Sequence, residues 1–407
     1  MILSQQFYFY LCLFIIILGA ANFFEGKYFN PFTPLRIWSF GWLIPIILSQ
    51  VAWPLNLRWG NSLSLCIFLS VIFYLMGYFF IFFIPYSISQ KRVLIDNTFK
   101  LNLVNYHLLN IIAKWLFLIS IVSCIYIYIE AGGMPILNAD EKIRISLQSR
   151  EDYLWSIVLL SYISSFLSGI AYKNRRLYKS TFLLFVVMLI LLFLSGWKGT
   201  FSAFVLYFFL PNILFVKKTK KSFLLIFLLV ILAFFLITSL RLRENRFDIR
   251  LLLYYIFPNF LNLEKGIANC NTFHPGNIIF SGFLKLIYLP GVIFVPKDVV
   301  YTTWNVPTYL LFPYYDSGFF GVSLVSFLLG AYGRFFYHKI CTNNSIFFLF
   351  LYSLYIHFVL IMHNNYLLES AAPYYWTITM VIAIIIIKSP YFLKLKKRNN
   401  SNSKSFR

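Results

Sequence analysis

Apolar runs of about 20 residues recur along this chain, from near residue 7 to near residue 387. A run of that length crosses the hydrocarbon core of a bilayer as a helix, whereas a helix on a soluble core keeps one polar face. The chain is 60% hydrophobic and only 12% charged, which is more apolar than a soluble core can bury. These features exclude a soluble enzyme, a disulfide-bonded scaffold and a disordered protein. They predict an all-α, polytopic bundle of transmembrane helices.

The runs predict about eleven spans, with a range of 11–13 if two further apolar stretches also cross the membrane. The expected spans cover residues 7–24, 38–55, 63–84, 108–129, 153–172, 181–194, 201–216, 223–240, 317–332, 346–361 and 371–387. Two connections, 130–152 and 241–316, are too long for simple turns. The second contains apolar stretches at 251–263 and 278–295 that could lie on the membrane or dip into it. The expected organisation is therefore transmembrane segments at 1–129, 153–240 and 317–387, large loops at 130–152 and 241–316, and a basic tail at 388–407.

Basic residues orient the chain, because Lys and Arg resist transfer across the membrane. The connections assigned to the inner side, together with the tail, hold 22 of the 35 Lys and Arg residues, whereas of the 13 acidic residues only Glu25 and Asp96 lie there. We therefore expect the N-terminus and both large loops outside, and the C-terminus inside. No Lys or Arg precedes Lys27, which is the wrong pattern for a cleaved signal peptide. The basic tail is expected to be an anchor near anionic lipid rather than a nucleic-acid binder.

Several common catalytic motifs are missing from the sequence. The five cysteines show no C-x-x-C spacing, and there is no D-x-D, P-loop, G-x-S-x-G or H-E-x-x-H motif. Neither a disulfide framework nor a metal knuckle is expected. Any catalysis is expected to be metal-independent and to depend on Arg and Lys.

Charged residues gather in the first large loop, which opens with the turn GGMP at 132–135. Asp140, Arg144 and Arg150 follow within it. The turn needs no ligand to explain it, because Gly and Pro suit a tight exit from a helix. For the charged stretch, a solvated surface and a site for a charged substrate fit equally well.

A short outer hairpin, SGWKGT at 195–200, places Lys198 between two glycines at the membrane boundary. A cation there lies at the depth of lipid phosphates. Two explanations fit: the side chain extends to ordinary headgroups, or it contacts a lipid-linked phosphate.

The second large loop begins with RLRENRFDIR at 241–250. In a helix, Arg243, Arg246 and Arg250 share one face, and Arg241 shares the next with Glu244 and Asp248. Guanidinium groups bind diphosphate oxygens in bidentate fashion, so a diphosphate leaving group is a natural partner. Pairing with the neighbouring acids is the alternative.

Aromatic and titratable residues mark the approach to the late spans. Tyr314, Tyr315, Trp304 and Trp376 suit either an interfacial aromatic belt or stacking on sugar rings. The outer carboxylates and imidazoles available as a general base are those of Asp316, Glu369, His274 and His363.

Four motifs together resemble the O-antigen polymerase family: GGMP at 132–135, GWKG at 196–199, RLRENR at 241–246 and YYDSGFFG at 314–321. The resemblance follows the layout of most of the chain, although the hairpin carries Lys198 where such polymerases often carry Arg. It implies a bacterial inner-membrane enzyme that works at the periplasmic face. A glycan on undecaprenyl diphosphate would be transferred to the newest lipid-linked repeat unit, with release of undecaprenyl diphosphate.

The resemblance also implies roles for particular residues. Arg241, Arg243, Arg246 and Lys198 would hold the departing diphosphate, and Arg144 and Arg150 the second lipid-linked substrate. Asp140, Asp316 or Glu369 would accept the proton of the acceptor hydroxyl. No cofactor is expected, because the donor sugar is already activated. The implied partners are the lipid-linked glycan and membrane lipid, with a chain-length regulator and a flippase.

Two alternatives stay open. An O-antigen ligase has a similar architecture and the same need for cations. A flippase or transporter of lipid-linked sugars would need polar groups at mid-bilayer. The expected spans hold few beyond Asn110 and Lys114, which favours an enzyme.

Overall fold

The computed structural model describes residues 5–25, 32–52, 59–83, 105–134, 153–214, 236, 250–270, 272–273, 283, 308–342, 345–362 and 372–388. These residues form helices and no strand. By length and composition, five of the described helices could cross a membrane: Gln5–Phe24, Asn61–Ile81, Tyr106–Glu130, Leu154–Lys173 and Leu311–Thr342. Shorter apolar helices span Lys179–Leu194, Ile346–Ile361 and Ala372–Lys388. The predicted all-α, polytopic membrane fold is confirmed.

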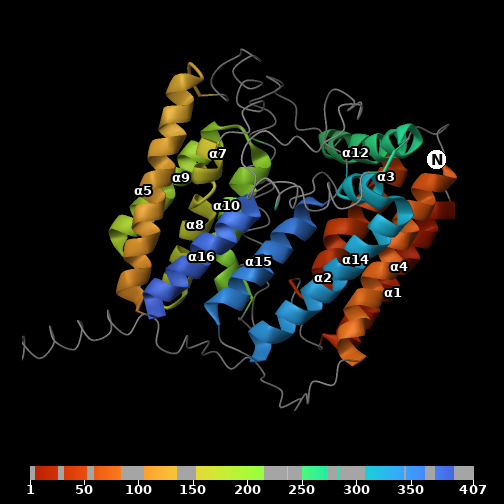
Figure 1. Ribbon diagram of the computed structural model, residues 1–407, viewed down its shortest axis with the longest axis horizontal. Helices are drawn as coiled ribbons and strands as arrows, with labels where there is room; N and C mark the ends of the chain where they lie inside the picture. The colour runs from red at the N-terminus through yellow and green to blue at the C-terminus, as the bar shows by residue number, and fades with distance from the viewer. Residues whose placement is uncertain are drawn as a thin grey trace, which may run out of the picture. The chain divides into compact units, whose positions relative to one another are not determined.

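The helices fall into two compact units. Unit 1 comprises residues 1–94, 248–343 and 351–374, and unit 2 comprises 95–247, 344–350 and 375–407. The first helices are α1 (Gln5–Phe24), α2 (Pro34–Trp38), the π-helical turn η1 (Ser39–Leu43), α3 (Ile44–Ala52), α4 (Asn61–Phe83) and α5 (Tyr106–Glu130). They are followed by α7 (Tyr153–Val158), α8 (Ser161–Lys173), α9 (Lys179–Leu194), α10 (Lys198–Ile213), α12 (Arg250–Asn269), α14 (Leu311–Thr342), α15 (Ile346–Ile361) and α16 (Ala372–Lys388) (Figure 1).

Most helix bounds lie within a few residues of the predicted spans, but two regions differ. The expected span at 38–55 is divided into α2, η1 and α3. Pro45 cannot donate to the carbonyl group of Gly41, and a π turn placed just before it accommodates that lost bond. The helix expected at 317–332 runs instead over Leu311–Thr342, so residues 334–339 continue a helix where a connection was predicted. The expected span at 223–240 lies outside the described residues, apart from Leu236.

Unit 1 is built around the close pairing of α4 and α14. A Cβ added at Gly77 would lie 1.9 Å from the carbonyl oxygen of Phe327, and one at Gly330 would lie 2.0 Å from that of Tyr74. Glycine is therefore required at both positions for the two backbones to approach so closely. Small residues at helix contacts are the usual means of tight packing within a membrane, where no hydrophobic effect drives helices together.

Unit 1 contains a network of buried tyrosine hydroxyls. The hydroxyls of Tyr74 and Tyr355 are 2.7 Å apart, and the Tyr74 hydroxyl donates to the carbonyl oxygen of Pro34 over 3.0 Å. Trp38 stacks on the Tyr74 ring with a centroid distance of 4.1 Å. Buried hydroxyls need such partners, because an unsatisfied polar group in an apolar environment costs several kcal/mol. The network joins α2, α4 and α15.

One end of unit 1 is covered by α12, which lies crosswise at the ends of α3 and α4 (Figure 1). Its residues Phe260, Leu263 and Ile267 are buried, while Lys265 is exposed. The spacing of three and four residues places the buried positions on one helix face. Residues 251–263, which the sequence predicts to lie on the membrane or dip into it, belong to this helix.

In unit 2, α5, α8, α9 and α10 pack against one another (Figure 1), and phenylalanine rings fill the contact between α9 and α10. Phe185 on α9 lies 5.0 Å from Phe204 and 4.3 Å from Phe208 on α10, by ring centroids. The Ser165 hydroxyl on α8 donates to the backbone oxygen of Phe204 over 2.7 Å. Aromatic pairs contribute about 0.5–1.5 kcal/mol each beyond the area that they bury.

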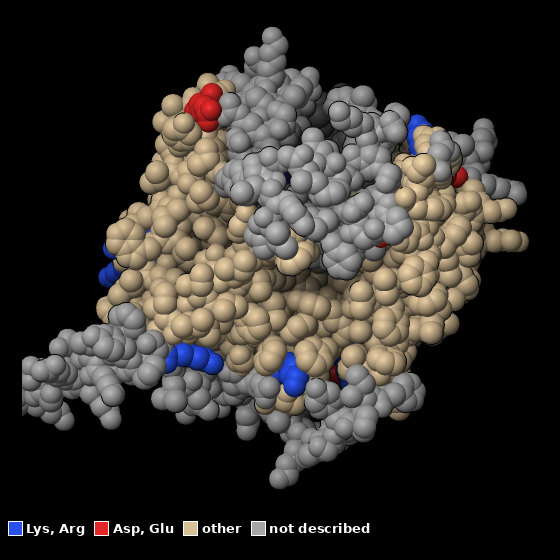
Figure 2. Space-filling model, viewed as in Figure 1, with Lys and Arg blue, Asp and Glu red and all other residues tan. Residues whose placement is uncertain are grey.

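The surface agrees with a lipid environment. Figure 2 shows a face dominated by uncharged side chains, with the charged side chains that it displays at its edges. Large apolar residues point outward from the long helices, including Ile16 at 65% and Val122 at 66% exposure. A soluble protein rarely exposes so much apolar surface.

Candidate functional site

Asp316 and Lys198 are the predicted site residues that the structure describes. Asp316 belongs to α14 in unit 1, and Lys198 begins α10 in unit 2. The other predicted residues lie outside the described part of the chain: Asp140, Arg144, Arg150, Arg241, Arg243, Arg246 and Glu369. Their roles stay predictions.

Asp316 lies where α14 is broken. Ser317 (φ −151°, ψ 28°) and Gly318 (φ 61°, ψ −143°) depart from helical geometry inside Leu311–Thr342. Gly318 has a positive φ that residues with a Cβ rarely adopt, and a Cβ there would also lie 3.2 Å from the Phe273 ring. A broken helix at membrane depth is tolerated only where protein buries the freed backbone groups or where they line a cavity. Such breaks mark binding sites in many membrane proteins.

The carboxylate of Asp316 is buried and oriented. Its residue is 2% exposed, and the Ser317 hydroxyl donates to Oδ2 over 3.1 Å. Nearby in sequence, the Thr308 side chain is fully buried, and its Oγ1 has no hydrogen-bond partner among the described residues. A buried carboxylate held by a neighbouring hydroxyl can act as a general base once a substrate hydroxyl comes within reach.

Next to this broken helix, α12 is fixed against unit 1 by aromatic and polar contacts. Phe260 lies between Trp42 and Trp59, with centroid distances of 5.8 and 5.6 Å. The Glu264 carboxylate accepts a hydrogen bond from the Gly60 backbone N–H over 2.7 Å, just before the first residue of α4. A carboxylate at a helix N-terminus is stabilised by the positive end of the helix dipole. The contact therefore joins α12 to the start of α4.

Lys198 lies at the positive end of α10. The hairpin before it turns at Gly196 (φ 70°), and the Ser195 hydroxyl accepts from the Trp197 backbone N–H over 3.1 Å. Trp197 meets Trp155 edge to face at 4.5 Å. Lys198 itself is 9% exposed, so its side chain is packed into unit 2 rather than extended over the surface. The ammonium group and the helix N-terminus both favour an anion at this point.

The aromatic residues considered for sugar stacking are mostly packing residues. Trp376 is 1% exposed and meets Tyr162 edge to face at 5.1 Å within unit 2. Tyr315 is 6% and Tyr314 is 9% exposed. Their faces are covered by protein in this conformation, so they contribute to the core. Trp304 lies outside the described residues.

Sequence reasoning missed Ser317, Glu264 and Thr308. Ser317 had a local signal, because Asp-Ser-Gly inside an apolar stretch is typical of a turn. The partner of Glu264 is 204 residues away in sequence, and no local pattern indicates such a contact. Among the described residues, no three His, Cys, Asp or Glu side chains gather as a metal site. The structure has no disulfide among the five cysteines, all of which it describes.

Comparison with protein families shows a match over most of the chain. The family model described as "Putative O-antigen polymerase" matches residues 31–376 of the 407, from just before α2 into α16. Nothing matches significantly among curated proteins or among solved structures.

Proposed function

The chain belongs to the O-antigen polymerase family, whose members polymerise O-antigen repeat units, and from this premise we propose that its substrates are undecaprenyl-diphosphate-linked oligosaccharides. The family match over residues 31–376, on an all-helical membrane fold, carries the proposal. The reaction takes place at the periplasmic face of the bacterial inner membrane. A chain-length regulator and a flippase act with the enzyme.

The proposed reaction is a glycosyl transfer. The acceptor hydroxyl oxygen forms a bond to the anomeric carbon of the growing glycan, and the bond from that carbon to the diphosphate breaks. The electron pair leaves with undecaprenyl diphosphate, and the hydroxyl proton passes to a carboxylate. Since negative charge develops on the leaving group, preorganised cations are the main requirement of the site. The step needs neither a nucleotide nor a resident metal ion.

Cations supply the leaving-group site. Arg241, Arg243, Arg246 and Lys198 bind the departing diphosphate, and Arg144 and Arg150 hold the second lipid-linked substrate. The burial of Lys198 at the N-terminus of α10 supports its role in binding diphosphate, because the positive end of the helix and the ammonium group attract the same anion. Guanidinium groups stay charged at every physiological pH, so the grip on diphosphate does not depend on proton uptake.

A carboxylate serves as the base, with Asp140, Asp316 and Glu369 as the candidates. Of these, the structure describes Asp316, whose carboxylate is oriented by Ser317 at a break in α14. Backbone groups freed by that break can also bind sugar hydroxyls. Substitution of Asp316 by Asn would keep the shape and remove the base.

The experiment that tests the function is Arg243→Ala in a strain whose surface polysaccharide is separated by size. We expect the chain-length ladder to disappear while lipid A core bearing a single repeat unit persists, since polymerisation alone is lost. Removal of one preorganised charge contact typically lowers turnover by about 100-fold or more. Lys265→Ala is the matched control, because Lys265 is an exposed cation on α12 in the same loop.

Loss of the single-repeat product as well would contradict a polymerase. That result would indicate a ligase, which attaches the glycan to the core, or a flippase, which acts before that attachment.

A further inference from the structure

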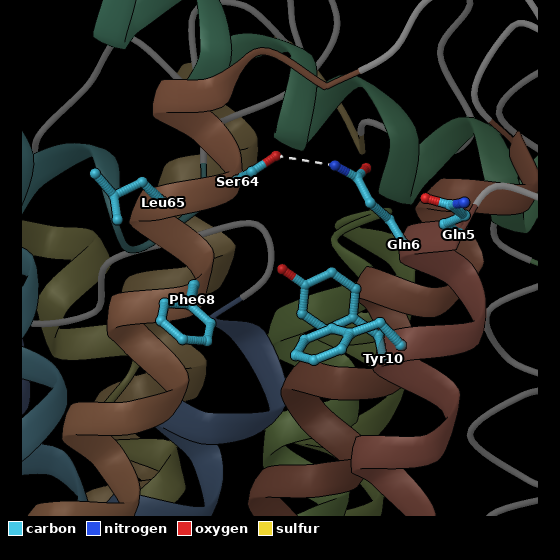
Figure 3. A pocket seen from close by; sticks show the side chains of 7 residues that line it. Gln5, Gln6, Tyr10, Ser64, Leu65 and Phe68 are labelled. Carbon is cyan, nitrogen blue, oxygen red and sulfur yellow. Dashed lines mark hydrogen bonds between the residues drawn. The ribbon is translucent and has the colours of Figure 1, made fainter.

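A groove with one polar end lies between α1 and α4 in unit 1. It encloses about 400 Å³. Gln5, Gln6 and Ser64 line one end, and Phe9, Leu65 and Phe68 line the rest. Figure 3 shows Gln6 reaching from α1 to Ser64 on α4 above the rings of Tyr10 and Phe68, and its Nε2 donates to the Ser64 hydroxyl over 3.1 Å. The polar atoms at this end are uncharged amides and a hydroxyl.

A second groove, of about 460 Å³, lies further along α4 on the side of α14. Its lining is entirely apolar: Ile72, Leu75, Met76, Phe79, Phe80 and Phe327. Several of these side chains point outward, with Met76 at 51% and Phe80 at 52% exposure.

The two grooves follow the same face of α4. Leu65, Phe68, Ile72, Met76 and Phe79 are separated by three or four residues, which places them in one stripe on a helix. The opposite face, with Cys66, Tyr74 and Tyr78, is buried in unit 1. The stripe therefore forms one apolar face of α4, which α1 contacts at both ends, through Gln6 at Ser64 and Phe24 at Phe79, and α14 borders at the second groove.

Its length decides what kind of chain can fill it. From Ser64 to Phe80 the helix rises about 24 Å, at about 1.5 Å per residue. The hydrocarbon core of a bilayer is about 30 Å thick, so one leaflet supplies only about 15 Å. A phospholipid acyl chain ends near the middle of this stripe, whereas a long polyprenyl chain can follow all of it.

We propose that this stripe of α4 holds the tail of the polyprenyl carrier, and that the tail leaves the groove at the end lined by Gln5, Gln6 and Ser64. The inference rests on the proposed function, which supplies the polyprenyl lipid. The polar end of the groove is the end of α1 and α4 predicted to face the periplasm, where the diphosphate reacts. The wholly apolar second groove then takes the far part of the tail. This arrangement anchors the substrate through its longest part and leaves its head at the membrane surface.

Photocrosslinking tests the proposal. The probe is undecaprenyl diphosphate with a photoreactive group near the tail end, added to the purified full-length protein in vesicles of phosphatidylethanolamine and phosphatidylglycerol. We expect crosslinks in the peptide that contains residues 64–80. Excess unlabelled undecaprenyl diphosphate should compete, and raising the phosphatidylglycerol share of the vesicle lipid should not.

The double variant Leu65→Trp, Met76→Trp fills the stripe with two indole rings. We expect crosslinking of the probe to weaken about tenfold, because the lipid tail would lose contacts equivalent to about two methylene groups. Val122→Trp is the control, because Val122 is equally lipid-facing on α5 at 66% exposure, and it should label like the unmodified protein. Crosslinks spread evenly over other outward helices, or equal competition by phosphatidylglycerol, would overturn the proposal. The crosslink map of the unmodified protein decides the matter even where the double variant fails to fold.

Failure of this inference is distinct from failure of the proposed function. Crosslinks that map to another helix, in a protein whose Arg243→Ala variant loses only the ladder, overturn the tail site alone. Loss of the single-repeat product in that variant overturns the polymerase function, whatever the crosslinks show.

Discussion

Glu25, just after α1, is a carboxylate that the fold surrounds. Its Oε1 accepts from the Leu35 backbone N–H over 2.8 Å and from the Tyr78 hydroxyl over 3.2 Å. The guanidinium of Arg334 in turn donates to the Tyr78 hydroxyl over 3.1 Å and lies over its ring. Burial raises the pKa of Glu25, and this effect outweighs the hydrogen bonds and the charges of Arg36 and Arg334, which lower it. The residue joins α1, α2, α4 and α14.

The raised pKa predicts a pH-dependent stability. Because the folded pKa exceeds the unfolded value of 4.5, the contribution of Glu25 is fully present below that value and is lost as the pH rises through the folded pKa. Glu25→Gln keeps an acceptor oxygen without the buried charge. We expect its Tm in detergent to match the unmodified protein at pH 4.5 and to exceed it by about 2 °C at pH 8. If Glu25→Gln were less stable than the unmodified protein at pH 8, the attraction of Glu25 to Arg36 and Arg334 would outweigh the cost of burying its charge.

Lys198 gives a second prediction at this scale. Lys198→Met keeps much of the packed side chain and removes the charge, so the chain-length ladder should weaken by about 100-fold per molecule of protein. Lys198→Arg should retain most of the ladder, because a guanidinium binds diphosphate at least as well. Quantified ladders at matched protein levels measure both. A full ladder from the Met variant would mean that Lys198 is a packing residue only.

At the scale of elements, the attachment of α12 to the start of α4 gives a testable prediction. Glu264 is its polar attachment to α4, and the Cys270 thiol, one residue beyond the helix, reports on its position. Glu264→Ala leaves the Gly60 N–H without this acceptor, at a cost of about 1–3 kcal/mol. We expect faster maleimide labelling of Cys270 and a weaker chain-length ladder, since α12 directly follows the arginine run.

Two variants control this prediction. Glu264→Gln retains an acceptor oxygen and should label slowly, and Lys265→Ala changes a charge on the exposed face and should behave like the unmodified protein. Unchanged Cys270 labelling in Glu264→Ala would show that the aromatic contacts of Phe260 suffice to hold the helix.

At the scale of the whole molecule, orientation across the membrane is the decisive prediction. Cys270 belongs to the loop predicted outside, and Cys341 lies near the end of α14 predicted inside. In single-cysteine variants of intact cells, an impermeant maleimide should label Cys270 and spare Cys341 until the membrane is opened. Burial raises the pKa of the Cys270 thiol, so its labelling should accelerate as the pH rises. The reverse pattern would place the arginine run in the cytoplasm and exclude its proposed role.

The helix positions were predictable because lipid offers the backbone no hydrogen-bond partners. Each apolar run must therefore close its own bonds as a helix, and its length sets the helix bounds. The run expected at 108–129 is observed as Tyr106–Glu130, and that expected at 346–361 as Ile346–Ile361. The prediction was less accurate for α14, because the charges of Arg334 and Lys339 indicated a connection, whereas the helix continues beyond the apolar run.

The amino-acid sequence by itself determined that this chain is a helical membrane protein, and its short motifs identified the family, since both depend on local composition and spacing. Tertiary structure alone decided which side chains are covered. It buried Trp376 and Lys198 and attached Glu264 to Gly60, which is 204 residues away in sequence. Such outcomes depend on contacts between segments far apart in sequence, and an apolar run does not indicate which of its faces meets protein and which meets lipid.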